Sequence, residues 1–109
     1  VAAFFSDLQG HALADRVLLA TYSEFGRRVE ENGSLGTDHG TASPLFLASP
    51  ALRKAGLIGE RPSLTELDDN GDLKFGIDFR SVYATLLENW LGFESKPVLG
   101  EQFTTLDVV

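Results

Sequence analysis

The sequence contains no cysteine and no methionine. Without cysteine, disulfide bonds, thiolate catalysis and zinc sites built on cysteine are all excluded. A chain that lacks methionine even at position 1 is expected to be a processed product or, as we favour, a piece excised from a longer protein. Its first residues, Val1–Phe5, lack the basic region with which a signal peptide begins.

Basic residues are also scarce. Nine Lys and Arg stand against sixteen Asp and Glu, which gives a formal net charge of −7. A surface that binds duplex nucleic acid needs clustered Lys and Arg, so neither nucleic acid nor an anionic membrane surface is an expected partner. No apolar run approaches the roughly 20 residues of a membrane-spanning helix, so no membrane span is expected.

Apolar residues, by contrast, are plentiful enough for a packed core. They make up 43% of the 109 residues and include eight Phe. This length suits one domain and not two. Residues 1–109 are therefore expected to form a single domain or the C-terminal part of a larger one.

The apolar pattern predicts helices at both ends and strands between them. Val17–Tyr22 and Pro44–Ala48 have no polar alternation, which is typical of strands covered on both faces. The clearest element is an amphipathic helix over Phe79–Leu91, with Asp78 as N-cap and Gly92 as its stop. The remaining expectations are a helix over residues 1–14, a loop over 31–43, a helical turn at 51–54, and short strands at 56–59, 73–77 and 106–109.

This order of elements predicts an α/β fold with a largely parallel sheet and flanking helices. Two helices and three or four strands would cover such a sheet poorly. The chain is therefore expected to be part of a larger sheet.

Asp38-His39 is the sharpest candidate for a metal site. Neighbouring side chains on a strand point to opposite faces, but a loop between Gly36 and Gly40 can fold both inward. Imidazole and carboxylate together suit zinc, manganese or iron. Alternatively His39 binds the metal and Asp38 orients it, or the pair is solvated on a flexible loop.

Ser23–Arg28 follows the first predicted strand, where open α/β sheets gather ligand groups. Glu24 is a candidate metal ligand or general base. The planar guanidinium of Arg27 is suited to holding a phosphate or sulfate oxygen. The alternative is a short helix in which Arg27 and Arg28 pair with the glutamates that follow. No Gly-rich phosphate loop and no nucleophile elbow occur, so the catalytic residues stay unknown.

Three motifs, in order, carry a family resemblance: residues 21–28 (TYSEFGRR), 36–42 (GTDHGTA) and the pair 72–74 (DLK) with 78–84 (DFRSVYA). They resemble the C-terminal part of domain of unknown function family 1501, a group of bacterial sulfatase-like proteins. The likeness covers nearly the whole chain. It implies part of the three-layer sandwich of the alkaline-phosphatase and sulfatase superfamily, with metal ligands on loops at the ends of parallel strands.

Carried over residue by residue, the resemblance gives a partial site. Where the superfamily has an Asp-His metal-binding pair after a strand, this chain has Ser23-Glu24, so that only Glu24 is left to substitute. His39, five residues before Pro44, matches a later histidine ligand, with Asp38 beside it. The superfamily's nucleophile lies in an N-terminal half that this chain lacks.

The resemblance implies an uncharacterised sulfatase-like protein that hydrolyses small phosphate or sulfate esters with a divalent metal: zinc, manganese or calcium. In that view Glu24, Asp38 and His39 bind metal, Arg27 binds the anion, and the chain packs against the missing N-terminal part of its own protein. The implied location is the periplasm or outside the cell. The alternative is a non-catalytic binding or structural protein with a degraded metal site. The hydrolase hypothesis requires Glu24, Asp38 and His39 to converge.

Overall fold

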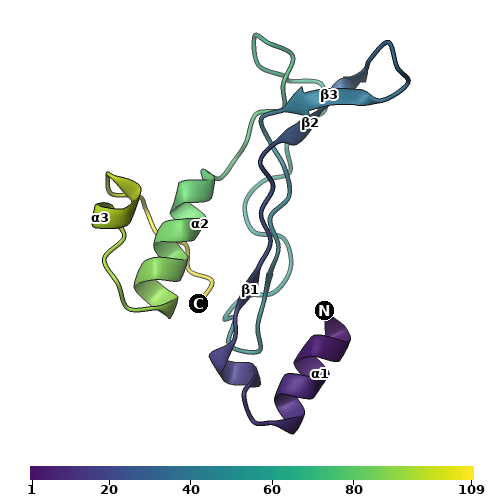
Figure 1. The fold of residues 1–109 in the computed structure, drawn as a ribbon. Coiled ribbons are helices and arrows are strands. Elements are labelled where there is room, and N and C mark those ends of the chain that lie inside the picture. The colour runs from purple at the N-terminus through teal and green to yellow at the C-terminus, as the bar shows by residue number, and fades with distance from the viewer.

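The computed structural model describes residues 1–109. The molecule is elongated, with extents of 50 × 35 × 21 Å (Figure 1). A long two-stranded ribbon runs through it, with one group of helices beside the ribbon and another at its end. The radius of gyration is 16.6 Å, against about 13 Å for a compact chain of this length. The fold is therefore far more open than an ordinary domain.

The ribbon consists of two antiparallel pairs of strands. Both pairs form between the same outgoing and returning segments of the chain. β1 (Leu19–Ala20) pairs with β4 (Leu47–Ala48), and β2 (Gly26–Glu31) pairs with β3 (Thr37–Gly40). The chain runs outward through β1 and β2 and returns through β3 and β4 (Figure 1). The prediction of an α/β fold with a largely parallel sheet, and with it part of a three-layer sandwich, is therefore wrong.

The short connection between β2 and β3 explains why they are antiparallel. Only residues 32–36 separate them, whereas a parallel pair needs a crossover of a dozen residues or more. The Asn32 side chain closes this turn, because its Oδ1 accepts hydrogen bonds from the backbone N–H groups of Ser34 (3.0 Å) and Gly36 (3.1 Å). The loop expected over residues 31–43 therefore contains a strand, β3, and its partner β2 was not expected at all.

The two strands approach each other closely at a pair of glycines. Gly26 lies opposite Gly40 in the β2–β3 register. A Cβ on Gly26, which is buried, would stand 1.7 Å from the carbonyl oxygen of Ala42, and one on Gly40 would stand 2.9 Å from the backbone of Arg27. No other residue type fits at either position without moving the backbone.

The apolar runs that suggested buried strands are only partly paired and partly covered. Val17–Tyr22 contributes just the two residues of β1, and Pro44–Ala48 just those of β4. Leu19, Leu47 and Ala48 are half-buried, and Ala20 is exposed. The strands expected at 56–59, 73–77 and 106–109 do not form, although the backbone N–H of Leu52 donates to Ser49 O in the expected turn near residues 51–54.

The first helix, α1 (Ala2–Gly10), confirms the predicted N-terminal helix but ends earlier than residue 14. Glycine has low helix propensity, so Gly10 is a natural last residue. A short 3₁₀ turn, η1 (Ala14–Arg16), follows. No residue of α1 is buried, and Phe4 remains 46% exposed.

The predicted helix over Phe79–Leu91 is confirmed. It forms as α2 (Phe79–Thr85), which widens into a π-helical turn, η2 (Leu86–Trp90). Asp78 is the N-cap, with its Oδ1 accepting the backbone N–H of Arg80 at 2.9 Å. Gly92 has φ +72°, the left-handed conformation that ends a helix.

The core is small and lies where the C-terminal segment crosses this helix. After α3 (Lys96–Leu99), the tail returns to α2, where the Leu106 N–H donates to the Thr85 hydroxyl at 2.8 Å. Further along, the carbonyl of Val108 accepts the Arg53 N–H at 2.9 Å. Eight residues are buried in the whole chain: Ala14, Gly26, Val82, Ala84, Thr85, Ser95, Val108 and Val109.

No helix of the structure combines the length and the apolar character that crossing a membrane requires.

Candidate functional site

One face of the ribbon brings together an arginine, a histidine and a phenylalanine. Arg27 and His39 are direct partners across β2 and β3, so their side chains are neighbours. The ring of Phe25 stacks on the His39 imidazole, with centroids 3.5 Å apart and planes 10° apart. We call this surface the Phe25–Arg27–His39 face.

Arg27 is held in a fixed position on this face. Its Nη1 donates to the carbonyl oxygen of Thr37 at 2.8 Å, and its Cζ lies 5.3 Å from the centroid of the Phe25 ring. The side chain is exposed to solvent. Because a guanidinium has five N–H donors, those not used by Thr37 remain free for an anion.

Asp38 lies on the opposite face of the ribbon, because it precedes His39 in β3 and side chains alternate along a strand. Its Oδ1 accepts a hydrogen bond from Asn32 Nδ2 at 3.0 Å. It borders a polar hollow of about 300 Å³ lined by Arg28, Glu30, Glu31, Asn32, Gly33 and Asp38.

Arg28 also serves the second face, where it pairs with Asp72 rather than with a neighbouring glutamate. Its Nε lies 3.2 Å from Asp72 Oδ1, and the Asp72 side chain is 14% exposed. This pair ties residues 68–73 to the ribbon. Nearby, the Thr41 hydroxyl donates to Leu73 O at 2.7 Å.

Glu24 lies in a bend just before β2 and is exposed. Together with Asp38 and His39 it does not form one ligand set, since no group of three or more His, Asp or Glu side chains stands in an arrangement that could hold a metal ion. As arranged here, the three residues do not fit a single ion. The metal site stays a prediction, and no chemical step is derived through it.

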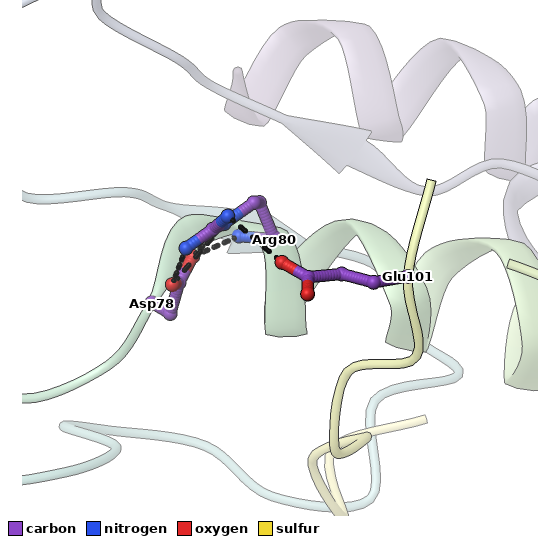
Figure 2. Close-up of polar contacts among 3 residues, drawn as sticks. All are labelled: Asp78, Arg80 and Glu101. Atoms are coloured by element: carbon purple, nitrogen blue, oxygen red, sulfur yellow. Dashed lines mark hydrogen bonds and ion pairs between the residues drawn. The ribbon is translucent and has the colours of Figure 1, made fainter. Parts of the chain in front are cut away.

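A second polar cluster joins the start of α2 to the C-terminal tail (Figure 2). Arg80 Nη2 lies 2.6 Å from Asp78 Oδ2, and Nη1 lies 3.3 Å from Glu101 Oε1. The Arg80 guanidinium also lies 4.5 Å from the centroid of Phe103. The hydrogen bond from Arg80 lowers the pKa of Asp78, and the same bond raises the pKa of Arg80. This cluster is a structural clamp.

A third cluster surrounds Glu88 in the π-helical turn. Its Oε1 accepts hydrogen bonds from the buried Ser95 hydroxyl at 2.5 Å and from Gln102 Nε2 at 3.0 Å. The Ser95 bond, followed by the Gln102 bond, lowers the pKa of Glu88. An open hollow of about 510 Å³ adjoins it, bordered also by Phe93 and Lys96. Nothing in the sequence pattern predicted this cluster, since its members lie up to 14 residues apart.

Sequence reasoning found Arg27 and His39 but missed Phe25. It placed His39 on a loop with Asp38, whereas the structure places His39 beside Arg27 and separates it from Asp38. The available signal was the two-residue spacing of Phe25 and Arg27, because residues two apart in extended backbone share a face and Phe25 immediately precedes β2.

Ribbon, helix and site together define an open helix-and-ribbon chain with an exposed basic and aromatic face. Comparison with known families identifies it further: the family described as "Protein of unknown function (DUF1501)" matches residues 1–100. The chain belongs to this family, which confirms that part of the resemblance. No curated protein and no solved structure matches the chain.

Proposed function

We propose that this chain is the C-terminal part of a sulfatase-like phosphate- or sulfate-ester hydrolase, in which it supplies an anion-binding face. The single observation that supports this is the pairing of Arg27 with His39 across the ribbon. Membership of the DUF1501 family, whose description names no activity, is compatible with this proposal.

Arg27 has the chemistry that such a face requires. A guanidinium binds two oxygens of a phosphate or sulfate group with parallel N–H donors. The bond from Arg27 Nη1 to Thr37 O fixes the direction of the group before the ester arrives. Charge placed in advance in this way stabilises the negative charge that develops in the transition state.

The convergence of Glu24, Asp38 and His39 that the sequence led us to require is not met within this chain. In the proposal the metal therefore takes most of its ligands from the rest of the protein, and the contribution of this chain is the anion-binding face. His39 and Asp38 lie on opposite faces of β3, so one ion would take only one of the two from this chain. A divalent metal, when bound, would polarise the ester oxygen. The proposed metal is zinc, manganese or calcium. The proposed location of the protein is the periplasm or outside the cell.

The covering partner in this proposal is the N-terminal part of the same protein. The exposed surface supports it: the chain exposes 7972 Å², whereas about 5,900 Å² is usual for a folded monomer of its mass. The difference of roughly 2,000 Å² matches what one side of an obligate interface buries. A second copy is disfavoured, because each copy carries a net charge of −7.

The test is turnover of chromogenic phosphate and sulfate esters by the full-length protein, together with elemental analysis. Arg27→Gln is expected to lower kcat/KM by about 10²-fold. Arg61→Gln is the matched control, since Arg61 is exposed and makes no hydrogen bond or ion pair. Equal activity of the two variants would overturn the role given to Arg27.

The second candidate function is a non-catalytic binding or structural protein. The observation that favours it is Ser23-Glu24, which stands where the superfamily has an Asp-His metal-binding pair. A full-length protein that binds no metal and hydrolyses neither ester would favour this candidate. Turnover that is lost on chelation would exclude it.

A further inference from the structure

We infer that the Phe25–Arg27–His39 face binds a planar aromatic anion, so that the ester it receives is an aryl ester. This inference rests on the proposed function and specifies its ligand class. The observation behind it is the stacking of two rings beside a fixed cation on one exposed side of the ribbon. The ring of Phe25 has no role in the predicted metal site or in the proposed anion binding by Arg27.

The two rings form a flat surface. Phe25 and His39 are 3.5 Å apart and within 10° of parallel, so the outer side of the exposed imidazole continues the stack. A third planar ring placed there gains stacking energy, because aromatic groups favour offset parallel contact. A compact inorganic anion gains nothing from such a surface.

The cation lies within reach of a group attached to the stacked ring. Arg27 is the direct partner of His39 across the ribbon, and side chains paired in this way have Cβ atoms about 4.5–5.5 Å apart. In an aryl ester a single oxygen joins the ring to the phosphate or sulfate group. The anionic group can therefore meet the guanidinium while the ring lies on the imidazole.

The face is also preorganised. The Arg27 bond to Thr37 O holds the guanidinium, and the glycine pair at positions 26 and 40 fixes the strand separation beneath it. Little conformational entropy is then lost when the ligand binds, which raises affinity for a ligand of matching shape. Asp38, the nearest acidic neighbour in β3, lies on the other face and is bonded to Asn32.

The experiment is an NMR titration of the 109-residue chain with phenyl phosphate, inorganic phosphate and benzyl alcohol, each followed through the signals of Phe25, Arg27 and His39. Phenyl phosphate is expected to bind about fivefold tighter than inorganic phosphate. Benzyl alcohol, which has the ring but no charge, is expected not to bind measurably.

Variants separate the two contributions. Phe25→Leu is expected to abolish the preference for phenyl phosphate, whereas Arg27→Gln is expected to abolish binding of both anions. Arg61→Gln should change neither. The signals of α2, which lies beside the ribbon and not on it (Figure 1), report whether each variant is folded. If Phe25→Leu disturbs them, His39→Gln provides the same test of the stacked surface.

The outcomes distinguish this inference from the function on which it rests. Equal affinities for phenyl phosphate and inorganic phosphate would overturn the inference while leaving an anion-binding face. Absence of any anion-dependent shift at Arg27 would overturn both. If Arg27→Gln loses ester turnover but the chain binds phenyl phosphate no tighter than inorganic phosphate, the proposed function is supported and this inference is not.

Discussion

Gly26 is the residue on which the close approach of the two strands depends. It is buried, and its position faces the backbone of Ala42 rather than a flexible side chain. Backbone cannot move aside as a side-chain end can, so an added methyl group must push the strands apart. The same separation sets the distance between Arg27 and His39, one residue further along each strand.

Gly26→Ala is therefore expected to destabilise the ribbon by about 1–3 kcal/mol. Amide exchange of β2 and β3 and the midpoint of urea unfolding measure this loss. Gly33→Ala is the matched control, since a Cβ there meets nothing within 4 Å. Equal effects of the two substitutions would contradict the proposed clash.

The candidate site was only partly predictable at this scale. Residue type alone identified Arg27 and His39 as candidates, because guanidinium groups commonly bind anions and imidazole groups commonly bind metals. They did not identify Phe25, whose role comes only from its stacking on His39. Asp38 was grouped with His39 because a loop was expected, and a strand separates the two.

At the scale of elements, the helix over α2 and η2 was the most predictable part of the chain. Its hydrogen bonds close within four or five residues, so periodicity and caps in the local sequence suffice. The strands were much less predictable. A strand's hydrogen bonds go to a partner elsewhere in the chain. Residues 26–31 (GRRVEE) show no apolar and polar alternation in the sequence, and their pairing is irregular, with a register shift between Arg27 and Glu31.

The pair formed by Asp78 and Arg80 makes this helix sensitive to acid. The Arg80 hydrogen bond lowers the pKa of Asp78 from its ordinary value of 3.8. A carboxyl group whose folded pKa is lowered adds stability above its unfolded pKa, and this stability disappears as pH falls through the folded pKa. The contribution is thus complete at neutral pH and is lost below about pH 4.

Arg80→Gln is expected to lower the melting temperature of the chain. This decrease should be constant from pH 7 to about pH 5 and should become smaller below about pH 4. Thermal unfolding followed by circular dichroism measures it. Arg61→Gln should show no such trend, and an Arg80→Gln difference that persists unchanged at pH 2 would contradict the assignment.

Thr85 connects the same helix to the C-terminal tail. Its fully buried hydroxyl donates to Ser81 O at 2.7 Å and accepts the Leu106 N–H at 2.8 Å. Thr85→Val leaves the Leu106 N–H without its acceptor, which is expected to cost about 1–3 kcal/mol. Amide exchange at Leu106 should accelerate accordingly. Thr104→Val, at an exposed tail position, is the control and should change little.

At the scale of the whole molecule, the apolar surface exceeds what the chain itself covers. The stripe predicted as core on α2 and η2 is a clear case: Val82 is buried, but Phe79 is 58% exposed and Leu91 is 54% exposed. Large apolar residues that are at least partly uncovered occur along the whole chain, among them Phe46, Phe75, Phe93 and Val98. This amount of exposed apolar surface supports the proposed covering partner.

Leu91→Ser distinguishes the chain alone from the full-length protein. In the 109-residue chain, where Leu91 is half exposed, the substitution should change the free energy of unfolding by less than about 0.5 kcal/mol. In the full-length protein, where a covering partner is proposed, the loss should reach about 2 kcal/mol or more. Chemical unfolding of both proteins gives the comparison.

Two results would contradict the proposal that the N-terminal part of the same protein covers this surface. One is an equally small loss in both proteins. The other is a stable dimer of the 109-residue chain in light scattering, because a second copy would then cover the surface instead.

The sequence by itself determined the α2–η2 helix with its Asp78 cap and Gly92 stop, the DUF1501 family, and the acidic, cysteine-free character of the chain. These properties are local or additive, so neighbouring residues suffice to set them. Tertiary structure alone decided that the strands run antiparallel, that Phe25, Arg27 and His39 share a face, and that Asp38 does not. Those outcomes depend on which distant segments pair and in what register, and one residue of shift moves every side chain to the opposite face.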